Sequence, residues 1–97
     1  MSRDAGATDA TGVRAVVEVL ARSLAGRPDA VRVTESQHKQ MTLIEVYVSP
    51  QDMPKMLGRM GRTVAALRTL ASTAGEREGK QVTVEIRETE RHRAGGQ

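Results

Sequence analysis

The stretch that decides the fold of this chain spans residues 56–64 and reads Met56-Leu57-Gly58-Arg59-Met60-Gly61-Arg62-Thr63-Val64. Its two glycines are three residues apart and frame an arginine and a methionine, with apolar residues on both sides. Glycine adopts backbone conformations that other residues avoid, so this spacing predicts a tight turn between two helices. With nine glycines in 97 residues, roughly one such pair is expected by chance, so the spacing needs support from its surroundings.

Positive charge is concentrated around this turn. Residues 53–75 include no acidic side chain and four basic ones, at Lys55, Arg59, Arg62 and Arg68. That segment carries +4, while the rest of the chain has eleven basic and twelve acidic side chains, which gives the formal net charge of +3. Backbone N–H groups in a glycine turn, set in a positive field, suit phosphate groups. The pattern favours a nucleic-acid backbone as the partner.

The composition argues against several other kinds of site. The chain is long enough for one domain, and it has no cysteine for a disulfide, a thiolate metal site or a thiol nucleophile. The histidines, His38 and His92, fall in a predicted loop and a predicted tail, and no serine has a recognisable catalytic partner. We therefore expect no catalytic residue, no metal and no cofactor. The first ten residues have no apolar segment and no apolar run could span a bilayer, so we expect a cytoplasmic protein without membrane contact.

Tyr47 is the only aromatic residue. Proteins that hold single strands by stacking bases need several exposed aromatic side chains, so an RNA-recognition motif, a cold-shock barrel or a single-strand-binding OB-fold is disfavoured. Leu43 and Tyr47 are expected on the outer face of a strand, either as ordinary half-exposed residues or as a contact surface. A single-strand binder of this composition has to use backbone donors and aliphatic surface.

Hydrophobic spacing predicts a first helix from residue 11 to about residue 25, capped by Thr11 or Asp9. Five apolar residues are spaced to share one face of this helix: Val13, Val16, Val17, Leu20 and Leu24. Two alternating segments follow, 31–34 and 42–48, and a five-residue polar loop at 36–40 joins them. This pattern predicts a β-hairpin.

The glycine pair falls between two further predicted helices. Ser49 or Asp52 caps a short helix over 53–57, and Gly58 ends it. The next helix begins at residue 61 or 62 and runs to about residue 74, where Gly75 is its natural C-terminal cap. A third strand is expected over 81–87.

The order of elements is α-β-β-α-α-β, which predicts an α+β fold in two layers, a three-stranded sheet with helices on one face. We expect residues 1–10 to be a disordered leader, 11–88 the folded domain and 89–97 a disordered tail.

This order, with Leu-Gly-Arg-Met-Gly-Arg-Thr-Val at the helix junction, resembles a type II KH domain. The span 12–87 resembles the small single-domain bacterial KH proteins of the KhpA family. The matching segments are 29–33, 48–52, 58–62, 66–70 and 79–82. Met60 departs from the pattern, because such domains often carry a basic residue there.

The resemblance implies an RNA-binding protein that holds short single-stranded RNA through its GXXG loop and an aliphatic groove. It also implies an RNA chaperone or post-transcriptional regulator that forms a homodimer, or a heterodimer with a larger KH-containing RNA-binding protein. The candidate RNA-binding residues are Leu57, Gly58, Arg59, Met60, Gly61, Arg62, Val64, Lys55 and Arg68.

These candidates have different expected roles. The glycines let the main chain approach phosphate, and Arg59 and Arg62 add charged donors. Leu57 and Val64 either line the groove or pack in the core, and Lys55 and Arg68 either contact phosphate or belong to a solvated helix face. Leu70 lies at the edge of the buried stripe of its helix, so it belongs either to the core or to a contact between two copies.

Two other functions stay open. The glycine turn is purely structural if the chain is a protein-interaction or ribosome-assembly module. Single-stranded DNA is the other candidate ligand, because the groove lacks an evident reader of the 2′-hydroxyl.

Overall fold

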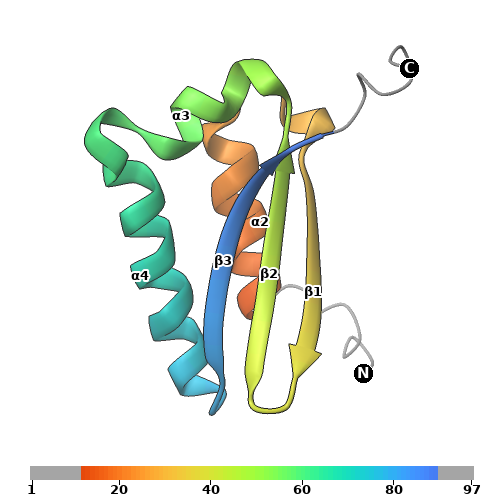
Figure 1. The fold of residues 1–97 in the computed structure, drawn as a ribbon, viewed down its shortest axis with the longest axis vertical. Helices are drawn as coiled ribbons and strands as arrows, with labels where there is room; N and C mark the ends of the chain where they lie inside the picture. The colour runs from red at the N-terminus through yellow and green to blue at the C-terminus, as the bar shows by residue number, and fades with distance from the viewer. Residues whose placement is uncertain (1–11, 90–97) are drawn as a thin grey trace, which may run out of the picture.

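The computed structural model describes residues 12–89, which form a sheet with a layer of helices on one of its faces (Figure 1). In chain order the elements are α2 (Val13–Leu24), β1 (Arg32–His38), β2 (Met41–Val48), α3 (Met53–Leu57), α4 (Arg62–Arg77) and β3 (Gln81–Glu88). Short 3-10 turns lie at Pro28–Ala30, Pro50–Asp52 and Arg59–Gly61. The predicted α+β class and element order are confirmed. The predicted leader, the caps Thr11 and Asp9, and the predicted tail from residue 90 onward lie outside the described residues.

The middle strand of the sheet is β2, which pairs antiparallel with β1 and parallel with β3. Parallel neighbours need a crossover, and α3 and α4 supply it. Alternation along β2 places every second side chain in the core, at Thr42, Ile44, Val46 and Val48. The predicted alternation of this strand is therefore confirmed. The side chains of Leu43, Glu45 and Tyr47 lie on its other face and are half-buried.

The hairpin between β1 and β2 is longer than predicted. Strand β1 continues to His38 and pairs there with Met41, so the turn holds only two residues. The first of them, Lys39, has a φ of 60°, the left-handed conformation that tight hairpin turns require. The prediction of a five-residue loop at 36–40 was wrong because the end of β1 is exposed and polar, and therefore lacks an apolar alternation.

Helix α2 packs on the sheet through a face that is rotated from the predicted one. Val13 and Val17 are buried as expected, but the other buried positions of the helix are Ala15 and Ala21. Leu24, predicted to be on the buried face, is 43% exposed. The small alanines let the helix approach the sheet closely, and the larger leucines are left at the side of the helix that faces α4.

Helix α4 extends past its predicted end. Gly75 was expected as the C-terminal cap, but it lies inside the helix and is buried. A Cβ atom on Gly75 would overlap the side chain of Val82 and would lie 3.1 Å from the carbonyl oxygen of Lys80. The glycine is needed because β3 passes close to the helix. The turn that follows uses Gly79, whose φ is 72°.

Asp52 connects two parts of the chain that are distant in sequence. Asp52 occupies the N-cap position of α3, as predicted, and Ser49 that of the preceding 3-10 turn, but neither side chain makes a capping hydrogen bond. The buried Asp52 carboxylate instead accepts hydrogen bonds from the backbone N–H groups of Gly26 (2.9 Å) and Arg27 (3.0 Å). Ser49 donates its hydroxyl to the same carboxylate at 3.3 Å. These bonds fix the start of α3 against the loop that follows α2.

No helix within residues 12–89 is long and apolar enough to cross a membrane.

Candidate nucleic-acid interface

The junction between α3 and α4 is the turn that the sequence predicts. Gly58 ends α3 with φ 77° and ψ 168°, and Gly61 precedes α4 with φ 75° and ψ 14°. Met60, between them, also has a positive φ, 57°. Three of four consecutive residues therefore have backbone conformations that L side chains rarely adopt.

The two glycines are required for different reasons. A Cβ atom on Gly58 would overlap the side chain of Thr63 and lie 2.7 Å from the Thr63 backbone nitrogen. At Gly61 a Cβ atom would meet nothing within 4 Å. Gly58 thus allows close packing of the turn on α4, whereas Gly61 leaves the backbone open to solvent at the point where α4 begins.

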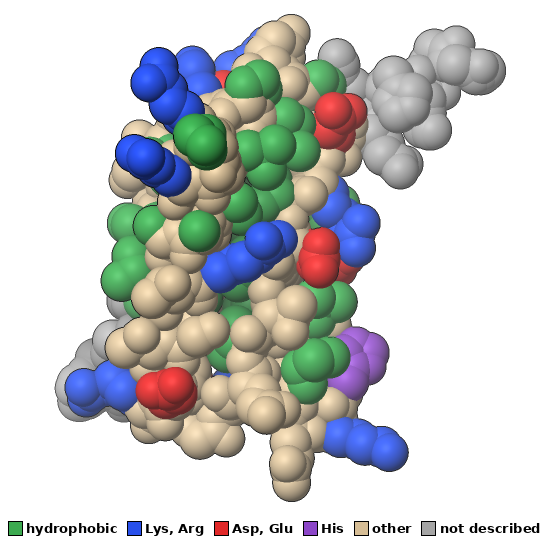
Figure 2. Space-filling model, turned by 60° about the vertical axis from the view of Figure 1, so that its left-hand side comes forward, with side chains coloured by type: hydrophobic (Ala, Val, Ile, Leu, Met, Phe, Trp, Pro, Cys, Tyr) green, Lys and Arg blue, Asp and Glu red, His purple; other side chains and the backbone are tan. Residues whose placement is uncertain are grey.

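The first turn of α4 is a positive end that no side chain covers. Its N-cap residue, Gly61, offers no side-chain hydrogen bond, and the helix continues for 16 residues. The N–H groups of Gly61 and Arg62 donate within the turn, to the carbonyl oxygens of Gly58 (3.0 Å) and Arg59. The helix dipole therefore provides the attraction of this end for anions. Arg59 and Arg62 flank it and are exposed. In Figure 2, Lys and Arg side chains gather near the top of the molecule, toward the end where α3 meets α4.

Apolar side chains are also exposed at the turn. Met60 is 86% exposed at its tip, and Leu57 is 40% exposed at the end of α3. Val64 is only 7% exposed, so it packs into the interior and offers little surface to a ligand. The apolar contact surface at the turn is therefore provided by Leu57 and Met60.

The two outlying basic candidates each have a partner within the chain. Lys55 Nζ lies 3.8 Å from Asp52 Oδ1, and the lysine side chain is still 59% exposed. Arg68 donates from Nε to the carbonyl oxygen of Val84 at 3.1 Å, so its side chain reaches from α4 to β3. Arg68 is nevertheless exposed.

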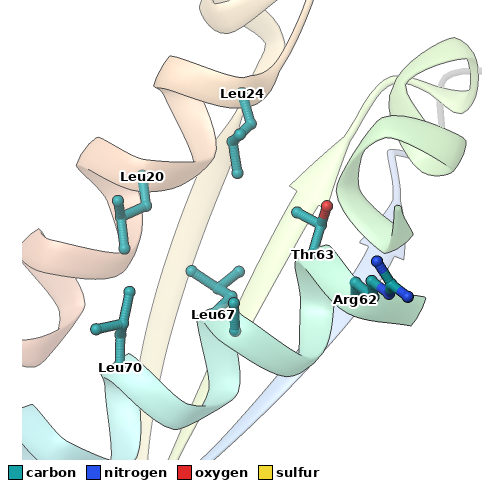
Figure 3. A pocket seen from close by; sticks show the side chains of 7 residues that line it. Leu20, Leu24, Arg62, Thr63, Leu67 and Leu70 are labelled. Carbon is teal, nitrogen blue, oxygen red and sulfur yellow. The ribbon is translucent and has the colours of Figure 1, made fainter. Parts of the chain in front are cut away.

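A second feature of α4 is an apolar groove of about 330 Å³ between α2 and α4. Leu20 and Leu70 face each other across it, and Leu24 lies at one end (Figure 3). Leu70, placed by sequence at the edge of the buried stripe, is 50% exposed here. Ala66 and Arg62, the second predicted as an RNA-binding residue, also line the groove. The groove residues that the sequence did not indicate for a contact surface are Leu20, Leu24, Thr63 and Leu67. The sequence showed the helical spacing of the leucines, but it did not show that the first and the last helix lie side by side.

Within residues 12–89, no group of three or more His, Asp or Glu side chains is placed to hold a metal ion. The described part of the chain therefore contains a positively charged glycine turn and no such cluster of metal ligands.

The fold and the loop together define a KH domain of type II, with the glycine turn between its two consecutive helices. Residues 14–86 match the family described as "KhpA/KhpB, KH domain", and the chain belongs to this family.

Two related proteins match this chain over nearly the whole of their own length. The RNA-binding protein KhpA of Clostridium perfringens is 39% identical over 74 residues, which cover 76% of this chain and 99% of that protein. The RNA-binding protein KhpA of Caldanaerobacter subterraneus is 44% identical over 71 residues, which cover 73% of this chain and 95% of that protein.

A solved structure has the same fold. It is the crystal structure of Era in complex with MgGDPNP and nucleotides 1506–1542 of 16S ribosomal RNA, with a TM-score of 0.57 and 19% sequence identity. The similarity covers 78% of this chain but only 29% of the Era chain, so it concerns the fold of one part of Era.

Proposed function

We propose that this protein binds single-stranded RNA at the turn between α3 and α4. The observation that carries the proposal is the uncovered N-terminal end of α4, opened by Gly61 and flanked by Arg59 and Arg62. Membership of the KhpA/KhpB family supports it, as do the relatives that are named RNA-binding proteins. KH domains hold about four unpaired nucleotides in this way.

Each residue of the turn has a role in this proposal. The positive end of the α4 dipole attracts one phosphate, which can approach the backbone closely at Gly61, and Arg59 and Arg62 bind its neighbours through charge-assisted hydrogen bonds. Leu57 and Met60 contact a ribose or a base edge, while Gly58 and Val64 hold the turn in place from inside. Lys55 adds charge that Asp52 partly compensates, and Arg68 presents donors to bases that lie between α4 and β3.

Such a site binds RNA without chemically changing it. We propose a non-enzymatic, cytoplasmic protein that acts as an RNA chaperone or post-transcriptional regulator, with residues 11–88 as its KH domain. A single small site reads few bases, so useful affinity requires a second site nearby.

A second site comes from association, for which we propose the apolar groove around Leu70. A half-exposed leucine next to Leu20 and Leu24 is stabilised when another protein surface covers it. The occupant is a second copy of this chain or a larger KH-containing RNA-binding protein. Either one brings a second RNA site to the same strand.

The direct test is a titration of single-stranded RNA, single-stranded DNA and duplex RNA against the purified chain at several salt concentrations. If about three phosphates are neutralised, log affinity should fall against log salt with a slope of about −2, from about −0.7 per phosphate. Duplex should compete poorly, because its bases cannot reach the protein. Binding that ignores salt or prefers duplex would contradict the proposal.

Two alternatives are separated by the same titration. Equal affinity for RNA and DNA would make single-stranded DNA an equally valid ligand. The alternative of a protein-interaction or ribosome-assembly module is supported by Gly58, because the close packing of Gly58 against Thr63 explains this glycine without any ligand. That alternative predicts no nucleic-acid binding at all, and partners recovered on the purified protein instead.

A further inference from the structure

The face of the sheet opposite the helices carries a row of three side chains that the loop site does not use. Arg32 of β1 and Arg87 of β3 are the direct neighbours of Tyr47 in the strand register. Because alternate residues of β2 are buried, all three lie on the outer face, which no described helix covers (Figure 1). The only aromatic side chain of the protein is thus placed between two guanidinium groups.

A hollow of about 490 Å³ lies beside Tyr47. Its lining consists of Arg32, Thr34, Tyr47 and Thr89, so it contains a guanidinium, a phenol and two hydroxyls, and no aliphatic side chain. Thr89 is held there by a hydrogen bond from its backbone N–H to the carbonyl oxygen of Val48, at 2.9 Å. This lining combines the apolar face of the phenol ring with a guanidinium and two hydroxyls, a mixture that suits a base and its phosphate.

The charges on the outer face of the sheet favour binding of a polyanion at the Arg32–Tyr47–Arg87 row. Within residues 12–89, Arg32 forms no ion pair, whereas Arg87 Nε lies 2.8 Å from Glu45 Oε2. Glu45 and Glu85 are direct neighbours on the next row of the same face. A phosphate is therefore attracted to Arg32 at the end of the sheet and repelled from the adjacent row of Glu45 and Glu85.

We infer that the Arg32–Tyr47–Arg87 row is a second contact for the same RNA strand, with one base stacked on Tyr47 and its phosphate at Arg32. An aromatic ring stacks on any base, and arginine planes stack and pair with phosphate. The row lies near the end of β2 that leads into α3 and the glycine turn (Figure 1). Nucleotides that flank those at the turn can therefore reach it around this end of the sheet. This inference rests on the proposed RNA site at the turn, which binds the other part of the strand.

The test compares two oligonucleotides of uridine, one of about four residues and one of about twelve. Wild-type protein should bind the longer one more tightly. Arg32→Gln and Tyr47→Leu should each remove most of that gain, at least about fivefold, and leave the affinity for the short one unchanged. Arg32 is exposed, so its replacement keeps the fold even if the Tyr47 variant is less stable. Lys39→Gln, in the hairpin turn at the other end of the sheet, is the matched charge control and should change neither affinity.

The outcomes separate this inference from the loop site. A variant of the turn should weaken both oligonucleotides, whereas a variant of the row should weaken only the longer one. An unchanged gain from length in folded Arg32→Gln and Tyr47→Leu would overturn the inference. So would a wild-type protein that gains nothing from length, or row variants that lose a protein partner while RNA binding stays intact.

Discussion

The side chain of Thr63 occupies the space that a Cβ atom on Gly58 would need. Gly58 also has a combination of φ and ψ, 77° and 168°, that is essentially restricted to glycine. The first glycine of the turn is therefore needed for folding, whatever the turn binds.

We predict that Gly58→Ala lowers the free energy of unfolding by at least about 2 kcal/mol, since overlap adds to backbone strain. Gly61→Ala is the matched control, because its φ of 75° is strained but its surroundings are open. It should cost about 1 kcal/mol. Urea unfolding of both variants gives the comparison, and equal losses would show that Thr63 does not restrict Gly58.

The parts of the fold that sequence predicts well are those decided by neighbouring residues. The turn needs two glycines within four residues, and β2 shows its buried face in its own alternation. Gly75 was misassigned because its partner, Val82, belongs to a strand that only the folded chain brings near. The role of the Asp52 side chain was misassigned for the same reason. Its hydrogen-bond donors, the N–H groups of Gly26 and Arg27, are 26 and 25 residues away in sequence.

The sequence likewise predicted some residues of the candidate site and not others. The positive, acid-free segment and the glycine spacing identified the turn directly. Whether a side chain near the turn is available to a ligand depends on how the helices pack. Packing leaves Leu57 exposed and buries Val64, and the sequence did not show this difference. The groove at Leu70 is formed by two helices and the row at Tyr47 by three strands. The periodicity within one element does not show which other elements lie beside it, so the sequence did not predict either feature.

The carboxylate of Asp52 should make the fold sensitive to acid. Hydrogen bonds from the backbone of Gly26 and Arg27, with smaller help from Ser49 and Lys55, hold the pKa of Asp52 below its ordinary value of 3.8 despite its burial. A lowered pKa stabilises the folded state above the unfolded pKa, and this contribution is lost as the pH falls through the folded value.

We predict that Asp52→Asn lowers the melting temperature by several degrees at neutral pH. The difference from the wild type should shrink as the pH falls below about 3.8, where the carboxylate of the unfolded chain takes up a proton, and should vanish once the pH has passed through the lower pKa of folded Asp52. Thermal melting at pH 7 and at acid pH measures it. Asp29→Asn, an exposed aspartate of the neighbouring turn, should have little effect at either pH. A difference that is the same at both pH values would rule out the charge of Asp52 as its source.

Association through the groove depends on Leu70. Replacing this half-exposed leucine with aspartate puts a charge on the proposed contact, at a cost to the fold of about 1 kcal/mol. We predict that Leu70→Asp is a folded monomer by analytical ultracentrifugation under conditions where the wild type associates. Thr69→Asp, exposed on the same helix but outside the groove lining, should associate normally. An unchanged mass for Leu70→Asp would place the contact elsewhere, and an unfolded protein would assign Leu70 to the core.

The central claim is that RNA binds at the turn between α3 and α4, and the replacement of Arg59 and Met60 together by aspartate tests it. Both glycines remain, and Asp tolerates the left-handed conformation of Met60. The fold should therefore lose at most about 1 kcal/mol. The control is Lys39→Asp with Gln40→Asp in the hairpin turn. It makes the same change in charge, and Lys39 has a φ of 60°, close to that of Met60.

The decisive measurement is the affinity of both double variants for single-stranded RNA, beside their thermal melting. The turn loses one positive charge and gains two negative ones where phosphates must lie, so we predict a loss of at least about tenfold for the Arg59 and Met60 variant. The hairpin control should bind nearly as the wild type does. Wild-type affinity in a folded Arg59 and Met60 variant would contradict the account and leave the glycine turn with a structural role alone.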